Sequence, residues 1–236
     1  MGFARVAGGG RATVPFKTPA NFADATWAQI IEACQKKRVP DTWLVANQKT
    51  MTIGGTDYSI DIIGKNHDTY SDGSDTAPLT LQLHDCYTDT ERMNGSETNS
   101  GWEECAMRNT YLQNILKMMP SEVQAGIRQV NKLTSAGNTN SAIETTADEL
   151  FLLSEIEIFG AIGYSAPGEG TQYEYYKAGN SKSKNRNGGA SDWWMRSPQI
   201  SKSGRFCYLY ESDSNGPSFG YAWETAQYGV SFAFCF

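Results

Sequence analysis

The last nine residues, Tyr228-Gly229-Val230-Ser231-Phe232-Ala233-Phe234-Cys235-Phe236, govern how the rest of this chain is interpreted. Large apolar side chains alternate with smaller ones from Val230 to Phe236, and a period of two is typical of a β-strand. A terminal strand this apolar is expected to be buried. We therefore predict that the chain ends in the centre of a sheet.

Further strands are predicted upstream from aromatic and β-branched runs bounded by polar turns. Two such runs flank Gly54-Gly55, where the glycines can supply the positive φ of a hairpin turn. Leu150 to Leu153 is expected to be a buried strand. The predicted strands are Thr50–Ile53, Tyr58–Ile62, Leu150–Leu153, Trp193–Met195, Phe206–Tyr210, Phe219–Trp223 and Val230–Phe236.

Helical spacing occurs in two zones. After Asp24, a candidate N-cap, apolar residues recur on one helical face from Trp27 to Cys34, and the helix should end before Pro40. A second amphipathic run spans 107–119. Pro120 should break it, and Ser121 with Gln124 suggests a capping box that opens another helix through Val130.

Three segments carry no such pattern. Residues 1–14 contain Gly8-Gly9-Gly10 and are interpreted as a flexible leader or the end of an upstream segment, which leaves 15–236 as one domain. Thr134–Ala147 is polar and predicts a surface excursion. Gly163–Gly189 is too long for an ordinary connection, and such loops tend to lie near functional surfaces.

Composition narrows the classes of function. The net charge of −6 and the isoelectric point near 5.0 give no electrostatic attraction to phosphate, so no nucleic-acid partner is expected. No apolar run reaches the roughly 20 residues that span a bilayer, and a secretion signal is not recognised at the N-terminus. We expect synthesis in the cytoplasm and no membrane insertion.

The residue types that hold metals or perform acid-base chemistry do not form a recognisable motif. The five cysteines are interpreted mainly as buried thiols, with a Cys207–Cys235 disulfide as the alternative. The acidic segment that begins at Asp68 lacks the bidentate acid of an EF-hand loop. We therefore predict no metal, no cofactor and no catalytic residues. A site at His67 or His84 beneath the Gly163–Gly189 loop remains the enzymatic alternative.

The C-terminal motifs support a resemblance. The segment Trp193-Trp194-Met195-Arg196-Ser197-Pro198 (W-W-x-R-S-P), the terminal Gly229-to-Phe234 strand (G-V-x-x-x-F) and the run that begins at Phe151 (F-L-L-S-x-x-E) resemble a family of bacterial and phage domains. That family is similar to the C-type-lectin-fold variable proteins of diversity-generating retroelements. The resemblance implies an α+β, C-type-lectin-like fold of the formylglycine-generating-enzyme-like subtype, with an irregular mixed sheet, two or three helices and long loops.

The resemblance also implies a framework that carries a variable region. The framework would comprise Trp193, Trp194, Arg196, Gly229, Val230 and Phe234. From the residues themselves, the tryptophans are interpreted as core and rim of a sheet, and Arg196 as part of a buried polar network that pins the loops. Positions of about 199–228 would form an exposed, hypervariable ligand-binding face. Its aromatic and small polar residues suit adaptable binding. The candidate ligand-binding residues are Ser203, Arg205, Tyr208, Tyr210, Ser212, Asp213, Asn215, Ser218, Phe219, Tyr221, Trp223 and Glu224.

The function expected on this basis is non-catalytic binding of a receptor or ligand. The expected partner is a bacterial cell-surface protein or glycan, the expected location is a virion tail tip or a cell surface, and the resemblance leaves a homotrimer open. One alternative is a structural tail or fibre subunit. Another is an enzyme of the formylglycine-generating-oxidase-like fold.

Overall fold

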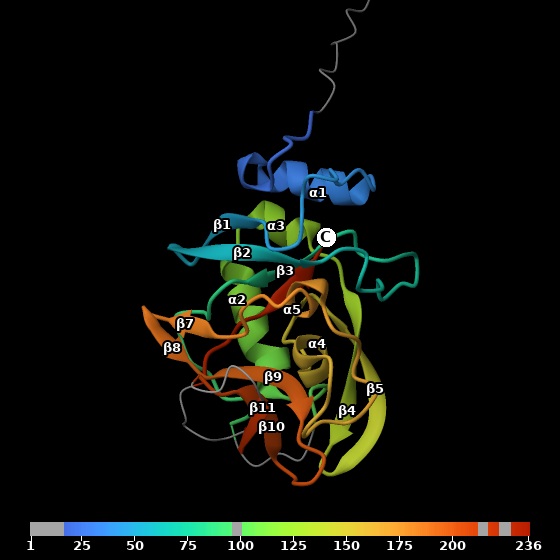
Figure 1. The fold of residues 1–236 in the computed structure, drawn as a ribbon, viewed down its shortest axis with the longest axis vertical. Helices are drawn as coiled ribbons and strands as arrows, with labels where there is room; N and C mark the ends of the chain where they lie inside the picture. Colours follow the sequence, from blue (N-terminus) through green and yellow to red (C-terminus); the bar gives the residue numbers. More distant parts are fainter. Residues whose placement is uncertain (1–16, 96–100, 212–216, 222–227) are drawn as a thin grey trace, which may run out of the picture.

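A computed structural model describes residues 17–95, 101–211, 217–221 and 228–236. The fold is α+β, as predicted, with short helices packed around several small sheets. Helix α1 (Trp27–Gln35) lies at one end of an elongated molecule, and strands β10 (Arg205–Leu209) and β11 (Pro217–Tyr221) lie at the other (Figure 1). Between them lie a central sheet, helix α2 (Leu112–Met118) and the hairpin of β4 (Val130–Gly137) and β5 (Asn140–Asp148).

The central sheet has five antiparallel strands, and the C-terminal strand is inside it. The spatial order is β1 (Gln48–Ile53), β2 (Thr56–Gly64), β3 (Thr80–Leu83), β12 (Ala233–Cys235) and β6 (Leu150–Phe151). Phe234 pairs with Leu81 on one side and with Leu150 on the other. The predicted central position of the terminal strand is therefore confirmed. The strand is shorter than predicted, and both its faces are buried.

The first two elements form largely as expected. The predicted apolar face of α1 is buried at Trp27, Ile30, Ile31 and Cys34. The N-cap prediction was wrong, because Thr26 caps α1 through a capping box with Gln29, while Asp24 lies in the 3-10 turn η1 (Phe22–Asp24). The hairpin of β1 and β2 turns at Gly54 and Gly55, which both have positive φ.

The second helical zone departs from prediction at its end. It comprises a π-helical turn η2 (Met107–Tyr111), α2 (Leu112–Met118) and α3 (Ser121–Gly126). Pro120 occupies the N-cap of α3 without a side-chain capping bond, so the capping box at Ser121 was wrong. The helix stops at Gly126 because the next residues pair with distant strands: the Arg128 amide donates to the Cys235 carbonyl at 3.0 Å. Tertiary pairing here overrides local helix propensity.

Polar strands were missed in the segment predicted as a surface excursion. Strands β4 (Val130–Gly137) and β5 (Asn140–Asp148) form a long hairpin whose turn residues Asn138 and Thr139 have positive φ. Most of β5 is exposed, so its side chains need not alternate between apolar and polar, which removes the usual strand pattern.

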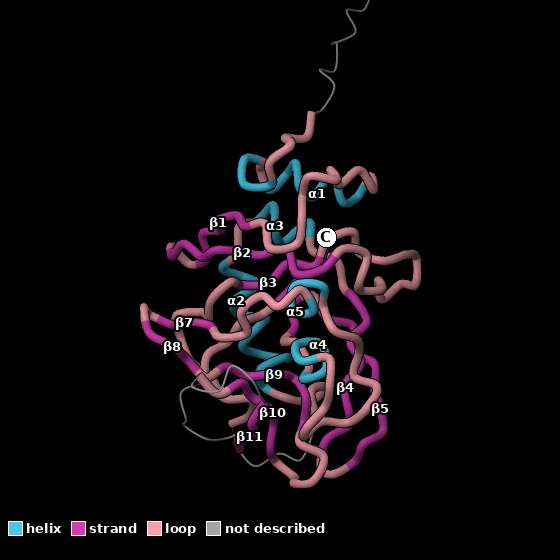
Figure 2. Tube along the Cα trace, in the orientation of Figure 1, coloured by secondary structure: helices cyan, strands magenta, loops and turns pink. Residues whose placement is uncertain are grey.

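The segment 163–189 is not a free loop. Figure 2 shows that it contains short elements, which are α5 (Glu174–Lys177) and β7 (Lys184–Arg186), the first strand of a hairpin with β8 (Gly189–Ser191). The preceding helix is α4 (Glu155–Phe159). Tyr173, Tyr175 and Tyr176 are buried and attach the segment to the core.

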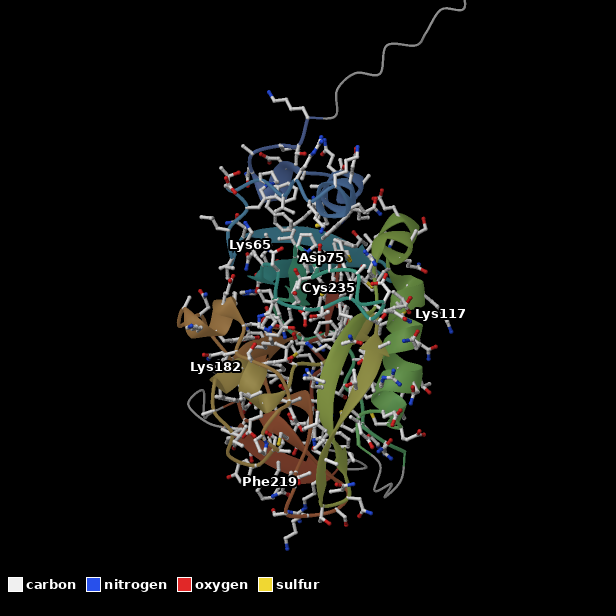
Figure 3. The ribbon with its side chains drawn as sticks, turned by 90° about the vertical axis from the view of Figure 1, so that its right-hand side faces the viewer. Lys65, Asp75, Lys117, Lys182, Phe219 and Cys235 are labelled. Carbon is white, nitrogen blue, oxygen red and sulfur yellow. The ribbon has the colours of Figure 1, made fainter. Side chains whose placement is uncertain are left out.

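A separate three-stranded sheet lies at the end opposite to α1. Its order is β11 (Pro217–Tyr221), β10 (Arg205–Leu209) and β9 (Trp193–Pro198). Figure 3 shows Phe219 of β11 at this end and Cys235 of β12 toward the middle of the molecule. All five cysteines are free and buried, so the alternative of a Cys207–Cys235 disulfide was wrong.

Replacing Phe234 tests the central position of the last strand. Phe234 is fully buried and lies edge-on to Phe236, with ring centroids 5.5 Å apart. Phe234→Ala should lower the free energy of unfolding by about 3–5 kcal/mol, measured by denaturant titration. Leu44→Ala, at a side chain that is 59% exposed, is the control and should change it by less than about 0.5 kcal/mol. Equal effects of the two variants would contradict the topology.

Candidate functional site

The three-stranded sheet is anchored to the rest of the protein by the buried guanidinium of Arg196. Arg196 of β9 is 0% exposed and donates to both carboxylate oxygens of Glu157 in α4. Its remaining N–H groups donate to the Thr134 hydroxyl at 2.9 Å and to the carbonyls of Leu133, Leu152 and Glu169. One side chain therefore joins β9 to β4, α4 and the chain near 169, which confirms the predicted network.

A second cation extends this network toward the central sheet. The Lys132 ammonium lies 2.7 Å from the carboxylates of both Asp68 and Glu157 and donates to the Tyr173 hydroxyl at 3.0 Å. Burial alone would raise the pKa of both carboxyls, but the neighbouring cations and hydrogen bonds outweigh it and lower both pKa values. We call Asp68, Lys132, Glu157, Tyr173 and Arg196 the buried charge network.

Two further buried carboxylates fix the chain beneath the sheet. Glu155 accepts the backbone N–H groups of Gly163, Tyr164 and Ser165. Glu169 accepts the Ser135 amide at 2.9 Å and the Ser197 hydroxyl. Burial raises the pKa of Glu169 despite these hydrogen bonds. Hydrogen bonds to carboxylates thus help to hold the segment from 160 to 170, together with the apolar packing of Tyr164 and Ala166.

The tryptophans of the W-W-x-R-S-P segment are structural, as predicted. Both are fully buried. The Trp193 indole donates to the Lys182 carbonyl at 3.0 Å, and the Trp194 indole donates to the Glu91 carbonyl at 2.8 Å. They connect the three-stranded sheet to two distant parts of the chain.

The outer strands carry the side chains of the predicted binding face. Tyr208 is half-buried, with its ring 4.2 Å from that of Tyr228 and 6.0 Å from that of Trp194. Phe219 is also half-buried and lies edge-on to Tyr164 at 4.9 Å. Tyr210, which follows β10, is 43% exposed.

The structure places the predicted site residues that it describes on neighbouring strands but on opposite sides of the sheet, with Tyr208 and Ser218 on one side and Arg205 and Phe219 on the other. Arg205 and Tyr208 lie on β10 and Ser218 and Phe219 on β11, and Tyr208 pairs directly with Ser218. Ser203 precedes β10 and is exposed. The side chain of Tyr221 lies outside the described part of the structure, as do residues Ser212, Asp213, Asn215, Trp223 and Glu224.

A hollow of about 320 Å³ adjoins Tyr210 and adds residues that sequence reasoning missed. It is lined by Arg186, Ala190, Ser191, Asp192, Tyr210, Glu211 and Tyr228. Asp192 accepts the Glu211 amide at 2.7 Å, and burial raises the pKa of Asp192. The sequence indicated these lining residues only weakly. The hairpin of β7 and β8, which supplies one wall of the hollow, lies in the segment that was interpreted as a loop.

A buried lysine attaches that hairpin to the core. The Lys184 ammonium donates to the carbonyls of Leu83 and His84, each at 2.7 Å, and lies 5.3 Å from the centre of the Trp193 ring. Burial lowers the pKa of Lys184 to about 8, because carbonyl groups replace the water that would stabilise its charge only in part.

The two histidines do not form one site. His67 follows β2 near the Gly64–Thr80 pair and stacks on Tyr173 at 4.0 Å. His84 follows β3 near the Ile60–Leu83 pair and bonds to Asp61 at 2.8 Å, which raises the pKa of His84. Because β2 and β3 are antiparallel, the histidines lie at opposite ends of this strand pair. Among the described residues, no group of His, Cys, Asp and Glu side chains is arranged to hold a metal ion.

The chain belongs to the family described as Domain of unknown function (DUF6273), which matches residues 78–235. The match contains β3, β12 and the complete three-stranded sheet, whereas α1, β1 and β2 precede it. Comparison with curated proteins and with solved structures gave no match. None of the helices within the described ranges is long and apolar enough to cross a membrane.

Arg196→Met tests the support of the sheet. It leaves Glu157 buried with half of its partners, and the loss of one member of a buried ion pair costs about 3–5 kcal/mol. We expect that decrease in the free energy of unfolding, measured by urea titration. Lys36→Met removes an exposed ion pair with Glu32 and should cost less than about 1 kcal/mol. An Arg196 variant as stable as the Lys36 variant would show that the network is dispensable.

The lowered pKa of Lys184 predicts how the stability of the protein depends on pH. Its pKa falls from 10.5 when unfolded to about 8 when folded, so the unfolded state binds more protons between these values. Stability should therefore rise with pH across this window. Relative to Lys184→Met, in which this titration is absent, the free energy of unfolding should increase by about 2 kcal/mol from pH 7 to 10. A difference between the two proteins that does not vary with pH would refute the shift.

Proposed function

We propose that this chain is a non-catalytic ligand-binding module of C-type-lectin-like fold, of the formylglycine-generating-enzyme-like subtype, and a relative of the variable proteins of diversity-generating retroelements. Its binding face comprises β10, β11 and the hollow beside Tyr210. The proposed partner is a protein or glycan on a bacterial surface, and the proposed location is a virion tail tip or a cell surface. A homotrimer is the assembly suggested by the same analogy.

The observation that carries this proposal is the contrast between the buried strand β9 and the surface beside the end of β10. Arg196 of β9 is fixed by six hydrogen bonds to side chains and carbonyls. Tyr210, which follows β10, is exposed beside a polar hollow. A rigid support under an aromatic and polar surface lowers the entropy cost of binding.

The buried charge network favours binding over catalysis. Both oxygens of Asp68 and both oxygens of Glu157 are already occupied by Lys132, Tyr173, Thr80, Arg196 and the Ser154 amide. These carboxylates therefore bond to partners inside the protein. The enzymatic alternative would need one of them to exchange a proton with a bound substrate instead of with a neighbouring side chain.

A structural tail or fibre subunit is the second candidate. The long exposed strand β5 favours it, because an unpaired strand edge can pair with a neighbouring chain. In that function, changes to the face at Tyr210 would leave attachment to bacteria unaffected.

Tyr210→Ala distinguishes the two candidates. Fluorescently labelled protein is titrated onto a panel of intact bacterial strains, and loss of a central aromatic contact should weaken binding to any positive strain at least about tenfold. Leu44→Ala removes another exposed apolar side chain, between α1 and β1, and should bind as the wild type does. Unchanged binding by a folded Tyr210 variant would contradict the assigned face.

A further inference from the structure

The buried charge network places an amine against a carboxyl group where both side chains are almost fully buried. The Lys132 Nζ atom lies 2.7 Å from Asp68 Oδ1, and both side chains are only 3% exposed. Nζ is also 4.3 Å from the centre of the Phe151 ring. An amine and a carboxyl group held in contact are the two groups from which an amide bond forms.

We propose that Lys132 and Asp68 condense spontaneously into an intramolecular amide bond. Transfer of a proton from Nζ to Oδ1 converts the ion pair into an amine and a carboxylic acid. The nitrogen then attacks Cγ of Asp68, a second nitrogen proton passes to the departing Oδ1 hydroxyl, and one water molecule leaves. The Nζ–Cγ bond forms as the Cγ–Oδ1 bond breaks, and no oxidant, metal or other reactant is needed.

Glu157 is placed to move the second proton. Its Oε1 lies 2.7 Å from Lys132 Nζ, on the same ammonium group that contacts Asp68. The paired Arg196 guanidinium keeps Glu157 in the carboxylate form that can accept a proton. Glu157 returns the proton to the departing oxygen and is unchanged at the end.

The other carboxyl oxygen faces hydrogen-bond donors. Asp68 Oδ2 accepts the Thr80 hydroxyl at 2.6 Å and the Tyr173 hydroxyl at 2.9 Å. Negative charge develops on this oxygen when the nitrogen attacks Cγ, and donors already in position stabilise it. Tyr173 and Thr80 thus perform for this step what an oxyanion hole performs in acyl transfer.

Charge balance and proximity both favour the condensation. The network contains two carboxylates and two cations, so removal of the Lys132–Asp68 pair leaves Glu157 and Arg196 as a balanced pair. Two buried charges disappear, which removes their desolvation cost. Holding the reacting groups in contact replaces a bimolecular encounter. The adjoining hollow of about 420 Å³, which Asp68, Lys132 and Glu157 help to line, lets the released water escape.

The bond would join two parts of the chain that are distant in sequence. Asp68 follows β2, which precedes the family match, whereas Lys132 lies on β4 inside it. The Asn131 amide already donates to the Thr69 carbonyl at 2.9 Å, so the backbones are in register for a cross-link. A covalent link would restrict the unfolded chain. This inference does not depend on the proposed binding function.

Intact mass spectrometry of the purified, denatured full chain tests the proposal. The wild type should be lighter than its sequence by one water molecule, and proteolysis should yield a branched peptide that contains both Asp68 and Lys132. Lys132→Arg should have the full mass. This variant is the necessary control, because an Asp72-Gly73 succinimide also loses water and would persist in it.

Two further measurements sharpen the test. Lys184 is equally buried but donates only to carbonyls, so its peptide should remain unbranched in the same digest. Glu157→Gln should retain the full mass, and a cross-linked Glu157→Gln protein would overturn the assignment of Glu157 as proton carrier. A wild-type protein with the full sequence mass and no branched peptide overturns the bond itself.

Discussion

The ion pair between Arg196 and Glu157 is the constraint on which the arrangement of this protein depends. A buried guanidinium is costly unless all its donors are satisfied, so β4, α4 and the chain near 169 must each present an oxygen at a defined place. That requirement fixes the position of β9, which pairs with β10, and β10 in turn pairs with β11. The central sheet is held differently, by apolar packing around Phe234 and its neighbours.

The central sheet is held by apolar packing and the three-stranded sheet by buried charged and polar contacts. This difference explains which features the sequence could predict. Alternation and aromatic content identified the terminal strand, the hairpin at Gly54-Gly55 and the buried tryptophans, because apolar burial leaves a periodic trace. Contacts among charged residues produce no periodic pattern in the sequence. Lys132, Asp68 and Tyr173 are distant in sequence and each looks like a surface residue, so their meeting in the interior could not be read from spacing.

The errors in the predicted ends of helices and strands also arise from contacts between residues that are distant in sequence. The helix was predicted to run through Val130, whereas α3 ends at Gly126, because the pairing of Arg128 with Cys235 and of Asn131 with Thr69 ends it early. Four of the predicted binding residues lie on β10 and β11, but Tyr208 and Ser218 point to one side of the sheet and Arg205 and Phe219 to the other, so they do not form a single face. Arg186 and the adjacent Asp192 were missed because the hairpin that carries Arg186 and ends just before Asp192 has only three residues in each strand, whereas Glu211 lies within the predicted region of about 199–228.

Native-state hydrogen exchange of the wild-type protein tests most directly whether the buried charge network makes the three-stranded sheet unfold together with the central sheet. The Trp194 and Arg196 amides donate to the carbonyls of Gly229 and Leu153, at 3.1 and 2.9 Å. They should exchange only by global unfolding, with the same free energy of opening as the amides of β12. Exchange of these two amides through local opening, while β12 stays protected, would show that the sheet is not fixed by the network.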